Sequence, residues 1–185
     1  MDLHLRDKHV LITGGSKGIG LACAQAFLDE GARVSLVSRD VANLNAARQS
    51  LQRSHGADRI HTVAANLREA LAALQALDSA EAAFGPVDIL VNSAGAAKRT
   101  PAAELTPEAW ADAMQAKYFT YIHMIDPTIK RMAALGQGTV VNVVGNGGKV
   151  ASPIHLPGGA ANAAFSGARR AGCRAGRGRP GRGGA

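Results

Sequence analysis

A glycine-rich turn near the N-terminus carries the strongest chemical signal in the sequence. The run from Thr13 to Gly20 follows a short apolar stretch and leads into a helical pattern. Glycines at such a turn allow the backbone to approach a pyrophosphate closely, and a helix N-terminus adds N–H donors and a positive dipole end. An ordinary strand-to-helix turn is the alternative, but the spacing and the position favour a dinucleotide site. Its candidate residues are Gly14, Ser16, Lys17, Gly18, Ile19 and Gly20.

The end of the next apolar run predicts which dinucleotide binds. Ser38 and Arg39 stand where an acid would hold a ribose 2′-hydroxyl or an arginine would accept a 2′-phosphate. Arg39, together with Lys17, favours NADP(H) over NAD(H). Asp40 could instead hold the ribose of NAD, but the N-cap of the following helix is the favoured interpretation of that residue.

Alternating strand and helix patterns must position these residues. Short β-branched runs predict strands, and longer periodic stretches predict helices. The strands are expected at 9–13, 33–38, 60–65, 87–92 and 139–144, and the helices at 18–30, 41–54, 68–84 and 107–135. The strands are apolar throughout, which indicates an α/β fold with a doubly wound parallel sheet covered on both faces. In the first helix a buried stripe is expected at Ile19, Ala22, Cys23, Ala26 and Phe27.

Three motifs in these elements resemble those of the classical short-chain dehydrogenases/reductases. They are Thr13-Gly14-x-x-x-Gly18-x-Gly20, Asn92-Ser93-Ala94-Gly95 after the fourth strand, and Val141-Asn142-Val143 in the fifth. The resemblance covers roughly residues 5 to 165. It implies a Rossmann-type sheet with strand order 3-2-1-4-5, truncated after the fifth strand. It also implies that Thr13 and Asn92 tie the central strands together, and that further cofactor contacts come from Ala94, Gly95, Asn66 and Leu67.

The catalytic residues that this resemblance implies are not matched. The family is known for a Ser, a Tyr-x-x-x-Lys and an Asn on the preceding helix, and its Tyr exchanges the proton of the substrate hydroxyl. Gly145 occupies the Ser position at the end of the fifth strand, and alignment of Asn162 with the family's Lys places Gly158 at the Tyr position. Counting seven residues on from Trp110 places Lys117 at the Asn position. No tyrosine follows Tyr121, so no shift of register restores the motif. The chain is therefore expected to be a poor or inactive reductase.

Three residues are candidate surrogates for the missing acid. Lys117 and Tyr121 lie four residues apart and share a helix face. His155 lies in the loop after the fifth strand and could serve as an acid–base group. Core packing of Tyr121 and a solvated position of His155 are the favoured alternatives. The other histidines show no metal-ligand spacing with cysteines or acids, so no metal site is predicted.

Composition limits the domain organisation. The 185 residues carry a net charge of +7, but six arginines and no acid fall within 166–185, so residues 1–165 are near neutral. Residues 1–165 are expected to form one dinucleotide-binding domain. Residues 166–185 are expected to be a disordered Arg/Gly-rich tail, because they contain no Leu, Ile or Val. That tail could bind RNA, act as a linker or result from a frameshift; the abrupt end of the resemblance favours a frameshift or truncation.

The remaining features set the expected function and setting. Two cysteines make no disulfide framework, and no apolar run predicts a signal segment or a membrane span. We expect a cytoplasmic, NADP-dependent oxidoreductase acting on a small carbonyl or alcohol substrate, impaired in this chain, with no membrane partner. The alternatives are a nucleotide-binding protein without catalysis and, more distantly, RNA binding through the tail, since nucleic acid is not the expected partner. A homo-oligomer could form through the helix at 107–135.

Overall fold

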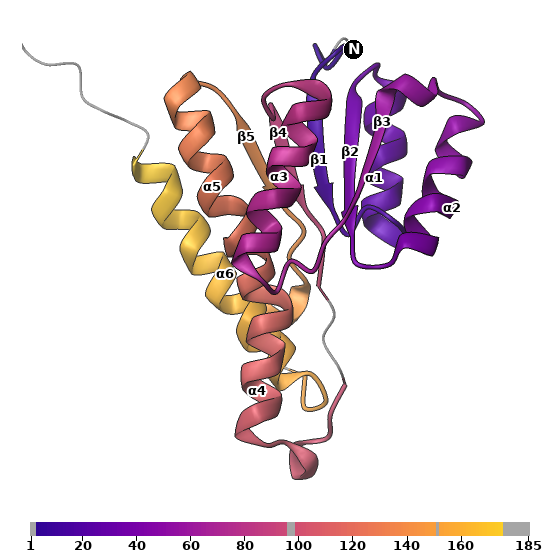
Figure 1. Cartoon of the computed structure of the whole chain (residues 1–185). Coiled ribbons are helices and arrows are strands. Elements are labelled where there is room, and N and C mark those ends of the chain that lie inside the picture. Colours follow the sequence, from indigo (N-terminus) through magenta and orange to yellow (C-terminus); the bar gives the residue numbers. More distant parts are fainter. Residues whose placement is uncertain (1–2, 96–98, 151, 176–185) are drawn as a thin grey trace, which may run out of the picture.

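Five parallel strands form the centre of the molecule in the computed structural model, which describes residues 3–95, 99–150 and 152–175 (Figure 1). The strand order is β3-β2-β1-β4-β5, and every neighbouring pair runs parallel. This order confirms the predicted Rossmann-type fold. The strands are β1 (His9–Thr13), β2 (Arg33–Ser38), β3 (Ile60–Ala64), β4 (Ile89–Asn92) and β5 (Thr139–Asn142).

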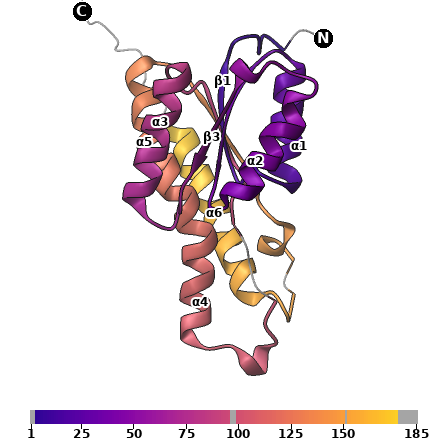
Figure 2. The ribbon, with the colours of Figure 1, turned by 45° about the vertical axis from the view of Figure 1, so that its right-hand side comes forward.

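Helices cover both faces of the sheet, and each face has its own core (Figure 2). Side chains alternate along a strand, so neighbouring residues of β1 reach opposite cores. Val10 and Ile12 pack with residues of α1 (Gly18–Asp29) and α2 (Val41–Gln52). Leu11 packs instead with residues of α3 (Ala70–Phe84) and α5 (Thr120–Leu135). The mostly buried strands β1, β2 and β4 and the two layers of helices together make the doubly wound fold.

The buried side of α1 differs from the predicted stripe. Gly20, Ala24 and Leu28 are the buried residues of this helix, whereas Ile19 is 61% exposed. The helix is turned this way because Gly20 packs against the backbone of the preceding turn, where a side chain would not fit. Cys23 of the predicted stripe does pack against the core, but it is only partly buried.

The segment predicted as one helix over 107–135 is helical throughout but changes its hydrogen-bonding pattern. It comprises α4 (Pro107–Ala113), a π-helical turn η3 (Met114–Phe119) and α5. The side chain of Thr106 caps the start of α4 by accepting a hydrogen bond from the N–H of Ala109. Single π-turns inside helices occur frequently at functional sites, and η3 carries Lys117.

The last helix, α6 (Leu156–Ala175), extends further than the sequence predicts. Disorder is expected from residue 166, whereas the helix continues to Ala175. Ala and Arg are strong helix formers, and a helix whose first half is packed through Ala161 and Phe165 can continue without large aliphatic residues. Residues 176–185, the rest of the expected tail, lie outside the described residues.

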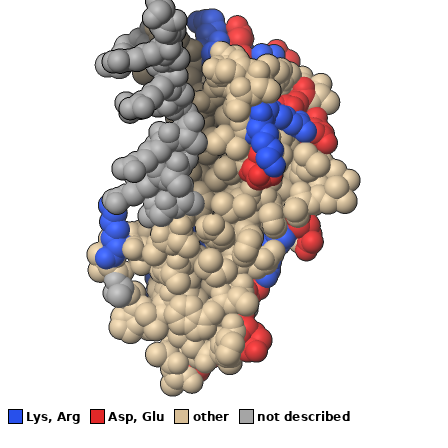
Figure 3. All heavy atoms as spheres, turned by 90° about the vertical axis from the view of Figure 1, so that its left-hand side faces the viewer, with Lys and Arg blue, Asp and Glu red and all other residues tan. Residues whose placement is uncertain are grey.

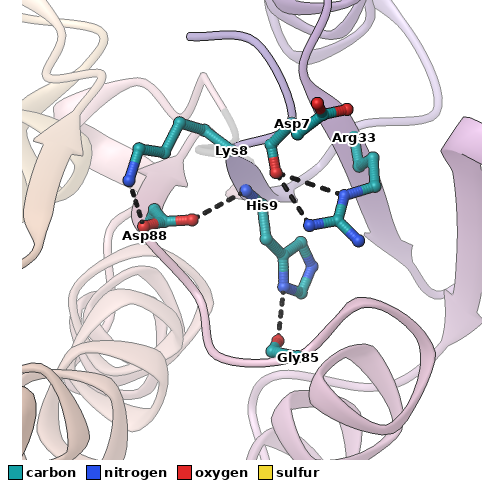
Figure 4. A network of polar contacts seen from close by, with 6 residues as sticks. All are labelled: Asp7, Lys8, His9, Arg33, Gly85 and Asp88. Atoms are coloured by element: carbon teal, nitrogen blue, oxygen red, sulfur yellow. Dashed lines mark hydrogen bonds and ion pairs between the residues drawn. The ribbon is translucent and has the colours of Figure 1, made fainter. Parts of the chain in front are cut away.

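A polar network joins the amino ends of the central strands, at the edge opposite the glycine turn (Figure 4). The buried ring of His9 has Nδ1 2.8 Å from the carbonyl oxygen of Gly85 and Nε2 2.8 Å from Oγ of Ser35. Asp88 accepts hydrogen bonds from Lys8 Nζ at 3.0 Å and from the N–H of His9 at 2.9 Å. Burial lowers the pKa of His9 below its ordinary 6.5. The network therefore holds an uncharged histidine inside the fold at neutral pH.

Charged side chains on the described surface form several pairs of opposite sign. Arg131 contacts Asp78 and Glu81, and Lys130 pairs with Asp126 four residues before it. Figure 3 shows a face on which Lys or Arg and Asp or Glu side chains lie next to one another in the upper part, while the lower part is mostly uncharged. Exposed ion pairs contribute little stability each, so the two apolar cores carry the fold. In the described part of the chain, every helix is too short or too polar to span a bilayer.

Candidate cofactor cleft and adjoining cavity

The glycine turn between β1 and α1 leaves its backbone open to a ligand. Gly14 has a φ of +66° and donates its N–H to the carbonyl oxygen of Val37 at 2.8 Å. A Cβ on Gly14 would lie 2.9 Å from Cα of Ala94, and a Cβ on Gly20 would lie 2.3 Å from the carbonyl oxygen of Gly14. No side chain caps α1, and its first turn carries no acid. The first N–H groups of α1 can therefore bind an anion.

A cleft of about 400 Å³ opens beside this turn, at the carboxyl ends of the strands. This is the edge at which doubly wound folds bind nucleotides. The large aliphatic side chain of Ile19 is exposed at this cleft, as expected of a residue that faces a ligand. Ten of the residues predicted to contact a cofactor line it: Gly14, Ser16, Lys17, Ile19, Ser38, Arg39, Asn66, Leu67, Ala94 and Gly95.

The other four predicted residues, Thr13, Gly18, Gly20 and Asn92, do not line the cleft but belong to the turn and to the strand ends that shape it. Thr13 Oγ1 accepts hydrogen bonds from the N–H groups of Ser93 and Ala94, at 3.1 and 3.2 Å. Asn92 Nδ2 donates to Asn142 Oδ1 at 3.0 Å. These bonds join the carboxyl ends of β1, β4 and β5, as the family resemblance implies.

Sequence reasoning missed six residues of the cleft lining. Three of them adjoin predicted residues along the chain, and a fourth, Arg68, directly follows Leu67. Ser93 lies inside a predicted motif, and extending the other predicted segments by one residue would have found Val37, Ala65 and Arg68. Ala116 and Thr120 come instead from η3 and the start of α5, and nothing local in the sequence marks them. The full set of missed residues is Val37, Ala65, Arg68, Ser93, Ala116 and Thr120.

Two cations stand at the cleft without a carboxylate partner. Lys17 and Arg39 are exposed, and neither forms an ion pair with any other described residue. Such cations are available to an anionic group on a ligand. Asp40 is engaged elsewhere, because its carboxylate accepts the N–H of Asn43 at 2.9 Å and caps α2. The N-cap interpretation of Asp40 is confirmed.

A second cavity of about 380 Å³ lies where the sequence analysis places the catalytic positions. Lys117, Gly158 and Asn162 line it. Gly145 adjoins them, because its N–H donates to Asn162 Oδ1 at 3.1 Å. The four aligned positions therefore converge at one place, although none carries the residue type that the family resemblance implies. The remaining lining residues are Asn146, Gly147, Val150, Ser152, His155 and Gly159.

The three predicted surrogate acids occupy different surroundings. Tyr121 is 1% exposed and donates its hydroxyl to the carbonyl oxygen of Val143 at 2.8 Å, and burial raises its pKa to about 12. His155 lines the second cavity, and its Nε2 accepts a hydrogen bond from Nε of Arg99 at 3.1 Å. Lys117 lines the same cavity, and its Nζ lies 5.4 Å from the centre of the Tyr121 ring. Tyr121 is thus a core residue, while Lys117 and His155 face the cavity.

Comparison with known proteins gives the family. The model of the short chain dehydrogenase family matches residues 8–175. This chain belongs to the short-chain dehydrogenase family. The D-threitol dehydrogenase of Mycolicibacterium smegmatis is 34% identical over 155 residues, which cover 84% of this chain and 59% of that protein. The chain thus spans about six tenths of the length of this relative.

Solved structures of the short-chain dehydrogenase family have the same fold. An NADPH-bound short chain oxidoreductase from Pseudomonas aeruginosa PAO1, described as containing an atypical catalytic center, superposes with a TM-score of 0.84 at 29% identity, over 90% of this chain and 66% of that one. The L-sorbose reductase of Gluconobacter frateurii, in complex with NADPH and L-sorbose, superposes with a TM-score of 0.86 at 28% identity, over 95% of this chain and 68% of that one. The predicted family is confirmed.

Proposed function

We propose that this chain is an NADP(H)-dependent oxidoreductase that interconverts a small carbonyl compound and its alcohol, with low turnover. The observation that carries the proposal is the cleft at the carboxyl edge of the sheet, with an uncapped helix N-terminus and two cations, Lys17 and Arg39, that pair with no described carboxylate. The helix N-terminus suits a pyrophosphate, and the two cations suit a 2′-phosphate. The NADPH complexes of the two structural relatives support the same assignment.

The residues of the cleft suit a dinucleotide. The turn around Gly14 and the start of α1 would hold the pyrophosphate, and Arg39 with Lys17 would hold the 2′-phosphate. Asn66 and Leu67 would lie beside the adenine. A nicotinamide bound in this way supplies or accepts a hydride. The residues of this chain would hold that ring near Gly95, which lies beside Lys117 at the edge of the second cavity.

A polyhydroxylated carbonyl or alcohol is the substrate class that we propose. Two relatives are named for such compounds, D-threitol and L-sorbose. The second cavity offers several hydrogen-bonding side chains for hydroxyl groups, from Asn146, Ser152, His155 and Asn162. Polar groups that fix orientation inside a small cavity are typical of sites for small ligands.

Low turnover follows from the residue types at three of the four aligned positions. Gly145 and Gly158 have no side chain that could orient a substrate or donate a proton, and the amide of Asn162 does not ionise. A positioned acid is worth about 10²–10⁴-fold in rate. The same observation favours a second candidate function, dinucleotide binding without catalysis. Turnover of D-threitol or L-sorbose separates the two candidates.

The proposal predicts that NADPH binds more tightly than NADH. A charge-assisted hydrogen bond contributes about 1.5–3 kcal/mol, so Arg39 alone should give a preference of about tenfold or more. Titration with both cofactors, followed by nicotinamide fluorescence, measures the difference, and Arg39→Ala should reduce it. Arg48→Ala removes the same charge from an exposed position outside the cleft and is the control. Equal affinity of the unmutated protein for both cofactors would contradict the proposal.

A further inference from the structure

Lys117 stands at the boundary between the cleft and the second cavity. Gly95 lines the cleft, and a Cβ on Gly95 would lie only 3.4 Å from Cγ of Lys117. Ala116 and Thr120, which are close to Lys117 in the chain, line the cleft, whereas Lys117 itself lines the cavity. The π-helical turn η3 therefore contributes to both walls. A ligand that spans the two spaces passes the Lys117 side chain.

The surroundings of Lys117 suit a group that exchanges a proton. The residue is half-buried, and no described carboxylate forms an ion pair with it. The groups that face it are the ring of Tyr121 on α5 and, across the cavity, His155 and the neutral side chains of Ser152 and Asn162. Burial lowers the pKa of the Lys117 ammonium below its ordinary 10.5. This brings Lys117 closer to the neutral range in which an acid–base group works best.

The other polar groups of the region are less suited to donate a proton. The Tyr121 hydroxyl is buried and already donates to Val143. Nε2 of His155 accepts a hydrogen bond from Arg99, which leaves only Nδ1 to act as a donor. Ser152 and Asn162 carry no ionisable group of suitable acidity. Among the described residues of the cavity wall, Lys117 is the one that combines a positive charge with a place beside the cleft.

We propose that Lys117 is the catalytic proton donor of this chain and acts on a carbonyl substrate held in the second cavity. This rests on the proposed function, in which NADPH supplies the hydride. In reduction, the hydride forms the new C–H bond, the carbonyl π bond breaks toward oxygen, and Lys117 transfers a proton from Nζ to that oxygen. The resulting amine regains a proton from water. The ammonium also stabilises the developing oxyanion before the transfer.

A test that does not depend on activity is the titration of Lys117 itself. Competitive acetylation of the full chain between about pH 7 and pH 11, followed by peptide mass spectrometry, gives the labelling midpoint of each lysine. We expect a midpoint for Lys117 clearly below the ordinary 10.5. The same lysine in the urea-denatured chain is the internal control and should label with a midpoint near 10.5. An unchanged midpoint in the folded chain would overturn the proposal.

The kinetic test compares Lys117→Met with the unmutated chain in the NADPH-dependent reduction of L-sorbose. Loss of the acid should lower turnover by about 100-fold or more and leave NADPH affinity within about twofold. In the unmutated chain, turnover should fall as the pH rises through the labelling midpoint. Lys117→Arg keeps the charge but gives up a proton poorly, so it should lose this alkaline fall and most of the turnover. Lys130→Met, on the exposed side of α5, is the control.

The outcomes separate this proposal from the one on which it rests. If the unmutated chain does not bind NADPH, the proposed function fails. If it binds NADPH and turns over, but Lys117→Met is equally active, only the assignment of Lys117 fails. If it binds NADPH and turns over none of the tested compounds, the oxidoreductase function and the role of Lys117 both fail, and dinucleotide binding remains.

Discussion

At Gly20, in the glycine turn, even the single methyl group of alanine would not fit. A Cβ at this position would lie 2.3 Å from the backbone oxygen of Gly14, so the turn itself would have to move. We predict that Gly20→Ala weakens NADPH binding about tenfold or more, because at least one charge-assisted hydrogen bond to the phosphates is lost. Fluorescence titration measures the affinity, and circular dichroism verifies that the variant is folded.

Gly136→Ala provides the matched control for that substitution. Gly136 caps the end of α5 with a φ of +70° and has open space around it, away from the cleft. Alanine there should cost about 1–2 kcal/mol of stability through backbone strain, without any change in NADPH affinity. Unchanged NADPH affinity in Gly20→Ala would show that the turn does not hold the pyrophosphate.

Individual residues of the site were predictable to the extent that their role is local. Thr13, Gly14 and Asn92 belong to short motifs whose geometry follows from the chain itself. Whether Tyr121 is an acid or a core residue depends on what packs around it. The contact of its hydroxyl with Val143 joins α5 to the chain after β5, and no local pattern encodes such a long-range contact.

At the scale of the helix, two interpretations of Asp40 can be separated: an N-cap of α2 and a ligand of the cofactor ribose. Its carboxylate caps α2 through the N–H of Asn43. We predict that Asp40→Ala lowers the free energy of unfolding by about 1 kcal/mol, the usual cost of losing an N-cap. Because the residue is not a ribose ligand in this view, the ratio of NADPH to NADH affinity should stay the same.

Urea denaturation and cofactor titration measure the two quantities. Thr106→Ala removes the corresponding cap of α4 and is the control, because no residue at the start of α4 lines the cleft. A marked loss of NADH affinity in Asp40→Ala, absent in Thr106→Ala, would assign Asp40 to the ribose instead.

Elements were predicted well where a single physical rule sets them. Continuous apolar runs placed all five strands within a few residues. For the mostly buried strands β1, β2 and β4 the reason is that a parallel strand covered on both faces needs apolar residues on both. Two features involve contacts between segments and were missed. The buried side of α1 is set by the approach of Gly20 to the turn, and the π-turn η3 packs against α6. The length of α6 follows instead from helix propensity beyond its packed half.

For the molecule as a whole, the order of the strands followed from the family resemblance, while the relation between its two cavities did not. The cleft and the cavity share the wall formed by Gly95 and Lys117, which lie far apart in the chain. Association of copies through 107–135 stays a prediction. Four large apolar side chains of that segment are at least one third exposed: Trp110, Phe119, Ile129 and Leu135.

The stability of the whole fold should depend on pH through His9. This ring is buried between β2 and the turn before β4, and burial holds its pKa below 6.5. In the unfolded chain His9 titrates near 6.5, so below that pH the unfolded state binds more protons than the folded state. The contribution of His9 is therefore fully present above about pH 6.5 and is lost as the pH falls toward the lowered folded pKa.

We predict that the melting temperature changes little between pH 7.5 and about pH 6.5 and decreases as the pH falls further, toward the lowered folded pKa of His9. His9→Gln should be less stable at the upper pH by about 1–3 kcal/mol, because Ser35 or Gly85 loses a buried partner. The same variant should show a smaller dependence on pH, since the titrating ring is gone. His155→Gln, at a half-exposed cavity position, should keep the pH dependence of the unmutated chain. An equally steep decrease in His9→Gln would place the titrating group elsewhere in the fold.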